Sequence, residues 1–80
     1  MDSNEVLKQM TEIFKSVMDN DDIVLNNNTT AADIEEWDSI THIQLIVAVE
    51  KHFKIKFSST EIRAFKNVGE LCQTVKAKLG

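Results

Sequence analysis

Apolar residues recur every three or four positions in three stretches of this chain, 4–18, 39–53 and 68–79, and this spacing constrains the fold more than any other feature. Such spacing places the apolar side chains on one face of a helix. In the first stretch they are Val6, Leu7, Met10, Ile13, Phe14, Val17 and Met18. The chain has no proline and only two glycines, which suits helices joined by polar loops and not a barrel with many tight turns. We therefore expect an all-α fold, a small bundle of four helices in which the third is short.

The composition limits the class of function. Eighty residues, 42% of them hydrophobic, are expected to form one domain, residues 1–80, with a thin core. The formal net charge of −4 opposes nucleic-acid binding and favours partners that present Lys and Arg. No apolar run approaches the ~18 residues of a membrane span, and the polar N-terminus does not resemble a signal peptide. We expect a monomer in the cytoplasm that neither binds nucleic acid nor inserts into a membrane.

Residues 19–38 interrupt the helical pattern with many Asp, Asn and Thr residues, whose side chains compete with helix by bonding to nearby backbone. A loop this long is uncommon in a compact domain and is usually functional. A single helical turn is expected around residues 31–34. The acidic start of the loop fails the EF-hand spacing, so no dedicated metal site is expected. Four apolar residues are expected to pin the loop to the helices: Ile23, Leu25, Ile34 and Trp37.

The helix expected at 39–53 carries two apolar stripes when residues are placed 100° apart. One stripe consists of Leu45, Ile46, Val49 and Phe53. The other consists of Ile40, Ile43 and Val47, with Glu50 projecting between the two. The first stripe suffices to dock the helix on a small core. The second is either covered by the long loop and the short helix, or it is a docking face for a partner with a basic patch.

The last third of the chain contains two capping signals. Residues 54–57 alternate like a strand, but no second strand exists to pair with them, so we expect an extended connection that buries its two apolar side chains. Ser58 and Glu61 have capping-box spacing for a short helix carrying Ile62 and Phe65. A second box starts the last helix, with Asn67 as its cap and Glu70 three residues later. The apolar stripe of that helix is Val68, Leu71, Cys72, Val75 and Leu79.

The single cysteine and the two histidines could suggest a chemical role, but the sequence pattern around them does not support one. The single cysteine, Cys72, lies on an apolar stripe, which indicates a buried and inert thiol. Asp38, Ser39 and His42 could be compared with a hydrolase site, but no Gly-x-Ser-x-Gly elbow is present. We therefore expect no catalytic residues. The other histidine, His52, is expected at the surface.

Ser39 has the most specific context of any polar residue, because it stands where the long loop meets the second helix. Either Asp38 or Ser39 is expected to cap that helix. Most serines at helix starts are only caps. If Asp38 is the cap, the Ser39 hydroxyl is free to react at the positive end of the helix dipole, which suits covalent attachment of a phosphorylated group.

The whole chain resembles the acyl carrier protein family. Asp38-Ser39-Ile40 is similar to that family's Asp-Ser-Leu attachment motif, and the segments 53–57 and 67–71 are similar to its second half. The resemblance implies that Ser39 carries a 4′-phosphopantetheine arm, transferred from coenzyme A by a phosphopantetheinyl transferase. The thiol of the arm would hold acyl intermediates as thioesters, and the protein itself would not be an enzyme.

The resemblance also implies roles for the residues around Ser39. Asp38 would help the transferase to position the site, Glu50 would be an acidic recognition position, and partner enzymes would contact Ile40, Ile43 and Val47. These partners would be a loading ligase or transferase and condensing enzymes, in a fatty-acid, polyketide or specialised acyl pathway.

Several positions of the second helix depart from the family's pattern. Gln44, Lys51 and His52 stand where carriers for fatty acid synthesis have more acid, which favours a carrier dedicated to a particular pathway. An aminoacyl carrier of the D-alanyl type is an alternative. A second alternative is an unmodified helical module that grips a partner through the face formed by Ile40, Ile43 and Val47.

Overall fold

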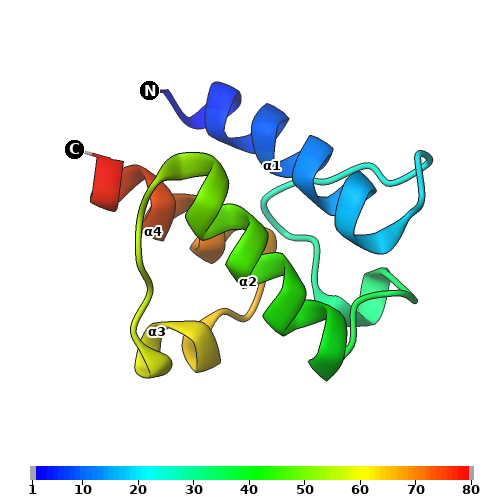
Figure 1. Ribbon diagram of the computed structural model, residues 1–80. Coiled ribbons are helices and arrows are strands. Elements are labelled where there is room, and N and C mark those ends of the chain that lie inside the picture. The colour runs from blue at the N-terminus through cyan, green and yellow to red at the C-terminus, as the bar shows by residue number, and fades with distance from the viewer. Residues whose placement is uncertain (1, 80) are drawn as a thin grey trace.

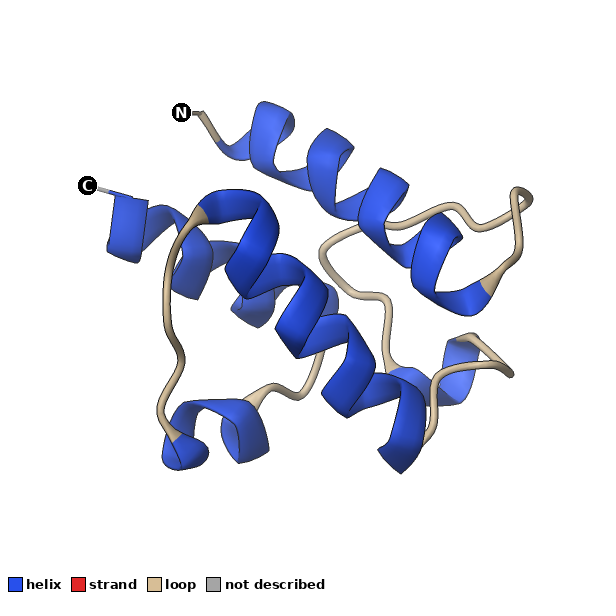
Figure 2. Cartoon of the chain, viewed as in Figure 1, coloured by secondary structure: helices blue, strands red, loops and turns tan. Residues whose placement is uncertain are grey.

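Helices α1, α2 and α4 pack together, and the short helix α3 follows α2 through the extended segment 54–58 and lies at the edge of the bundle (Figure 1). The computed structural model describes residues 2–79, and within that range it contains helices and loops but no strand (Figure 2). The helices are α1 (Ser3–Met18), α2 (Ser39–Phe53), α3 (Ser59–Ala64) and α4 (Val68–Leu79), with a 3₁₀ turn, η1 (Ala31–Asp33), in the long loop. The expected all-α bundle with a short third helix is confirmed. Within residues 2–79, no helix combines the length and the hydropathy that a membrane span requires.

Helix α1 begins and ends with the local signals that its sequence contains. The Asp2 carboxylate accepts a hydrogen bond from the Glu5 backbone N–H at 2.8 Å, which satisfies one of the unpaired donors of the first turn. The helix ends at Asp19, which takes a left-handed conformation with φ of 52°. Its apolar stripe faces inward, as the spacing predicts.

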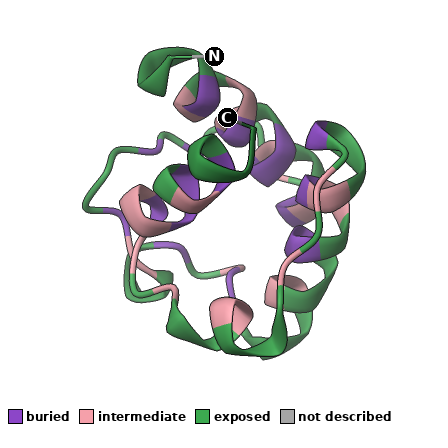
Figure 3. Ribbon diagram, turned by 90° about the vertical axis from the view of Figure 1, so that its left-hand side faces the viewer, coloured by how far each residue is buried: buried purple, intermediate pink, exposed green. Residues whose placement is uncertain are grey.

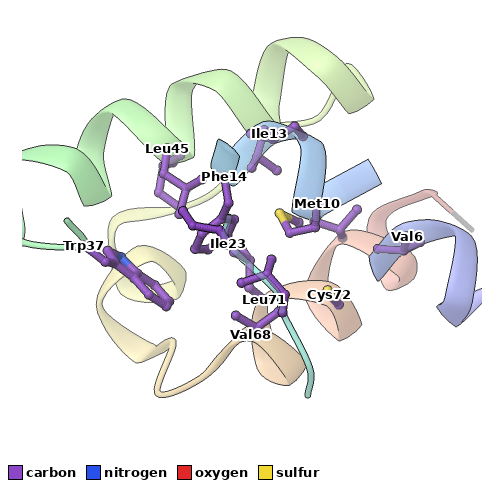
Figure 4. Close-up of a cluster of buried hydrophobic side chains, with 14 of the residues drawn as sticks. Val6, Met10, Ile13, Phe14, Ile23, Trp37, Leu45, Val68, Leu71 and Cys72 are labelled. Atoms are coloured by element: carbon purple, nitrogen blue, oxygen red, sulfur yellow. The ribbon is translucent and has the colours of Figure 1, made fainter. Parts of the chain in front are cut away.

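The core lies between the inward faces of α1, α2 and α4, and α1 contacts both of the other helices. Figure 4 shows side chains from these helices and from the long loop pointing toward one another. The nine side chains with almost no exposed surface are Val6, Met10, Phe14, Leu45, Ile46, Val49, Val68, Leu71 and Val75. The stripes expected for α1, α2 and α4 are confirmed, except that Leu7 and Val17 are only partly buried and Leu79 is 37% exposed.

The long loop between α1 and α2 is pinned by the four apolar residues expected to hold it. Ile23, Leu25, Ile34 and Trp37 are each only 7% exposed. The Trp37 ring meets the Phe14 ring edge to face, with centroids 5.0 Å apart. The helical turn expected near residues 31–34 is the 3₁₀ turn η1. The loop is therefore part of the core wall.

The same loop also caps α4, which the sequence did not predict. The Thr29 carbonyl accepts from Val68 N–H at 2.8 Å, and the Asn27 carbonyl accepts from Gly69 N–H at 3.0 Å. A Cβ atom on Gly69 would lie 2.7 Å from the Asn27 carbonyl oxygen, so a glycine is needed for this close approach. Asn67 caps Glu70 N–H at 2.9 Å as expected. The reciprocal half of the expected box is different, because the Glu70 carboxylate accepts from Lys66 N–H.

Helix α3 and the segment before it are held more thinly than the rest. The capping box between Ser58 and Glu61 is present, with bonds of 3.1 and 2.8 Å. However, α3 buries no side chain, and Figure 3 shows it only half-buried or exposed. The connection is extended as expected, but burial of its apolar residues is only partial. Four side chains of this region are half-buried against the core: Ile55, Phe57, Ile62 and Phe65.

Candidate functional site

Asp38, and not Ser39, is the N-cap of α2. Its carboxylate accepts from the backbone N–H groups of Ile40 and Thr41, both at 2.9 Å. The Thr41 hydroxyl accepts from Asp38 N–H at 2.8 Å, which completes a reciprocal box. The bond from Thr41 N–H, followed by weaker contributions from the Thr41 hydroxyl and Ile40 N–H, lowers the pKa of Asp38 below its ordinary 3.8. The first turn of α2 is therefore capped by a charged aspartate at neutral pH.

Ser39 is the first residue of α2, and its side chain is exposed. Within residues 2–79 its hydroxyl makes no hydrogen bond, because Asp38 already occupies the backbone donors that a capping serine would use. The hydroxyl thus stands at the N-terminal, positive end of the helix dipole without a competing partner. Of the two roles open to Ser39 from the sequence, the capping role is excluded by this geometry.

A groove of about 630 Å³ opens beside Ser39. It lies between the start of α2, η1, α3 and the residues that follow α3. Its walls combine apolar side chains with two basic ones, Arg63 and Lys66. The residues that line it are Ala31, Trp37, Asp38, Ser39, His42, Ile43, Ser59, Ile62, Arg63, Phe65 and Lys66.

His42 lines this groove but does not activate Ser39. Its Nδ1 accepts a hydrogen bond from Trp37 Nε1 at 3.1 Å. Its Nε2 lies 3.1 Å from the Ile62 carbonyl oxygen. Both ring nitrogens are thus engaged with groups other than the serine hydroxyl, so the arrangement is not that of a nucleophile and its general base.

The outer stripe of α2 faces solvent. Ile40 is 70% exposed, Ile43 55% and Val47 43%. Covering of this stripe by the long loop and α3 was one of the two interpretations left open by the sequence, and it is wrong. Isolated exposed apolar residues are ordinary, but three on one helical face beside an exposed hydroxyl form a patch suited to contact with another protein.

Glu50 is placed differently from the expectation that it projects freely between the two stripes. It is half-buried, and its Oε2 accepts from Phe57 N–H at 2.8 Å. The reason is the path of the chain after α2: Lys54 takes a left-handed conformation with φ of 59°, which turns the extended segment back toward Glu50. One oxygen of this carboxylate is therefore used inside the fold.

Two further side chains lie where the sequence places them. His52 is exposed and pairs with Gln9, with Nε2 2.7 Å from Oε1. Cys72 is buried, and burial raises the pKa of its thiol to about 11. The thiol is therefore protonated and unreactive at neutral pH.

Comparison with known proteins agrees with this geometry. The family model described as "Phosphopantetheine attachment site" matches residues 6–75. Among solved structures, the chain is similar to the holo acyl carrier protein from Geobacter metallireducens, determined by NMR in solution. The two sequences are 49% identical, the match covers 92% of this chain and 85% of that one, and the TM-score is 0.88. A search of curated proteins found no match.

Proposed function

This chain belongs to the acyl carrier protein family, whose members are carriers and not enzymes, and we propose that its covalently attached 4′-phosphopantetheine arm is joined to Ser39. The arm supplies a terminal thiol that holds an acyl group as a thioester. The chain's own residues present the attachment oxygen and contact the enzymes that load and unload the arm. Residues 1–80 would then form a single carrier domain, as expected from the sequence.

The observation that carries this proposal is that Asp38, and not Ser39, caps α2. Asp38 takes over the capping of α2 and leaves the neighbouring hydroxyl exposed. Attachment at this oxygen therefore breaks no hydrogen bond of the fold. The groove next to it has room and apolar walls for part of the arm, so the residues present fit this group. Arg63 and Lys66, which line the groove, favour a phosphate nearby.

The direct test is the intact mass of the protein after incubation with coenzyme A and a broad-specificity phosphopantetheinyl transferase. We expect a gain of one phosphopantetheine unit that is abolished in Ser39→Ala. Ser59→Ala is the matched control, because Ser59 is an exposed serine at the start of α3 that lines the same groove. Modification that persists in Ser39→Ala, or no gain with several transferases, contradicts the assignment. The second outcome favours the unmodified interaction module.

Contact with partner enzymes is proposed for the outer face of α2, formed by Ile40, Ile43 and Val47. The exposure of these three side chains supports this role.

We expect Ile40→Ser to slow the transferase reaction several-fold while the unfolding midpoint changes little, because little apolar surface is buried at a residue that is 70% exposed. Val24, which is 82% exposed in the long loop, is the matched control, and Val24→Ser should leave the rate unchanged. Equal rates for both variants contradict a docking role.

The proposed partners are enzymes that load, extend or unload an acyl chain in a specialised pathway. Three residues of α2 support this proposal: Gln44, Lys51 and His52. All three are exposed and none is acidic, so the surface of α2 carries less negative charge than it would with acidic residues at these positions. We expect malonyl transfer by a fatty-acid malonyl transferase to be slow, and to accelerate in the Gln44→Glu, Lys51→Glu double variant. Rapid transfer to the unaltered chain contradicts a specialised role. Efficient loading by an aminoacyl ligase instead favours the aminoacyl alternative.

Recognition by Glu50, the monomeric state and the cytoplasmic location remain predictions. For Glu50 the hydrogen bond to Phe57 N–H complicates a simple charge swap, because a variant also alters the fold locally. A loss of transferase rate in Glu50→Gln, compared at equal folded fraction, would support recognition by its charge.

A further inference from the structure

His42 joins three segments of the chain that meet at the groove beside Ser39. Trp37, at the end of the long loop, donates from Nε1 to His42 Nδ1 at 3.1 Å. The two rings also stack, with centroids 6.0 Å apart and planes inclined by 22°. On the other side, His42 Nε2 lies 3.1 Å from the carbonyl oxygen of Ile62 in α3. One side chain of α2 thereby links the loop to the backbone of α3.

The two contacts fix the tautomer of the neutral imidazole. The indole N–H can only donate, so His42 Nδ1 must be the unprotonated nitrogen. Nε2 then carries the proton and donates it to the Ile62 carbonyl. The charged groups that line the same groove are Asp38 from the start of α2 and Arg63 and Lys66 from the side of α3.

Helix α3 depends on such a link because little else holds it. It buries no side chain, and its carbonyls near the C-terminus lack intrahelical partners. The Lys66 N–H, which would serve Ile62 if the helix continued, instead donates to Glu70. The helix is also held by the half-buried side chain of Ile62 and by the ion pair between Glu61 and Lys78 at 3.0 Å, which is partly exposed and therefore screened by salt.

We propose that His42 is a positioning residue that holds α3 against α2 and so sets the width of the groove beside Ser39. Ile62 and Phe65 form the α3 side of this groove, and Ile43 belongs to the α2 side. When the contact with Ile62 opens, the α3 side moves away and the arm and its thioester lose their shelter. The sheltering role rests on the proposed function, whereas the link between α2 and α3 does not.

Three substitutions separate the two hydrogen bonds. His42→Asn keeps an acceptor near the position of Nδ1, His42→Gln keeps an N–H donor near that of Nε2, and His42→Ala keeps neither. His52→Ala is the control, because His52 is exposed and contacts Gln9 instead of α3. The Asn and Gln variants also keep the test valid if the Ala variant fails to fold.

The first measurement is backbone amide hydrogen exchange in the unmodified protein. We expect the amides of α3 to exchange about fivefold to tenfold faster in His42→Ala, the change that corresponds to the net strength of one hydrogen bond. His42→Gln should restore most of the protection and His42→Asn little of it. Unchanged exchange in the Ala variant, or equal exchange in the Gln and Asn variants, overturns the link through Ile62.

The second measurement is the rate at which hydroxylamine cleaves an octanoyl thioester on the modified protein. We expect cleavage to accelerate several-fold in His42→Ala, to stay near the unaltered rate in His42→Gln, and to be unaffected by His52→Ala. An unchanged cleavage rate in His42→Ala overturns the sheltering role. Absence of any modification at Ser39 refutes the proposed function instead, and the exchange measurement on unmodified protein still decides the link.

Discussion

Helices α1 and α3 are both capped at their N-termini by side chains, Asp2 and Ser58, yet they are held to the molecule in different ways. Helix α1 buries Val6, Met10, Ile13, Phe14 and Met18, whereas α3 buries none of its side chains. Helix α3 is instead held by the half-buried side chain of Ile62 and by polar contacts with His42 and Lys78. Burial resists opening in proportion to apolar area, while exposed polar contacts resist it weakly.

The two regions near Ser39 therefore differ in how tightly they are packed. The side built from α1, α4 and the long loop is a packed wall, and Trp37 anchors the loop to it. The side built from α3 is a thin wall of the groove. Elements that move to admit a ligand are drawn from the least stable parts of a fold. If the groove opens, we therefore expect α3 to move, and substitutions on the two sides should have unequal effects.

The largest expected effect is on the packed side. Phe14→Ala removes a fully buried ring that packs on Trp37, and we expect the free energy of unfolding to fall by about 3–5 kcal/mol. Phe65→Ala, at a half-buried ring beside α3, is the matched variant and should cost about 1–2 kcal/mol. Urea unfolding followed by circular dichroism measures both. Similar losses for the two rings would show that the walls are equally packed.

The next effect tests the joint between the long loop and α4. Gly69→Ala places a methyl group against the Asn27 carbonyl oxygen and should lower the free energy of unfolding by about 1–3 kcal/mol. Gln73→Ala, at an exposed position of the same helix, should change it by less than about 0.5 kcal/mol. Thermal unfolding of the two variants is compared. If Gly69→Ala leaves the stability unchanged, the long loop shifts easily away from α4 and is not part of the packed wall.

A smaller effect is expected on the α3 side. Glu50→Ala removes the acceptor for Phe57 N–H and should cost about 1 kcal/mol, because the contact is only half-buried. The Phe57 amide should then exchange with solvent several-fold faster. Lys51→Ala alters the exposed neighbouring residue and serves as the control. If Phe57 exchanges at the same rate in all three proteins, the segment before α3 is held by something other than Glu50.

The smallest effect concerns the cap beside Ser39. The pKa of Asp38 is lowered in the folded state, so its contribution to stability is present above the unfolded value and is lost as the pH falls through the folded one. We expect the melting temperature to fall less steeply below the ordinary pKa of 3.8 in Asp38→Asn, which keeps a capping oxygen but does not titrate. Melting curves at several acidic pH values test this. If the melting temperatures of both proteins depend on acidic pH in the same way, Asp38 does not contribute to the loss of stability in acid.

Much of the fold and of the site follows from local chemistry. The approximate helix bounds, the caps Ser58 and Asn67, and the apolar stripes depend on side chains a few positions apart. The position of Ser39 as the first residue of α2 belongs to the same class. Interactions over such short separations are present in any conformation that contains the helix, so the sequence pattern is enough to predict them.

The tertiary structure alone decided how distant segments meet. The sequence left open whether the outer face of α2 is covered, and it predicted neither the capping of α4 by Asn27 and Thr29 nor the bond from Phe57 to Glu50. The link from Trp37 through His42 to Ile62 belongs with these. Each depends on where one helix comes to rest against another, and that position follows from packing the whole core and not from the spacing of residues along one helix.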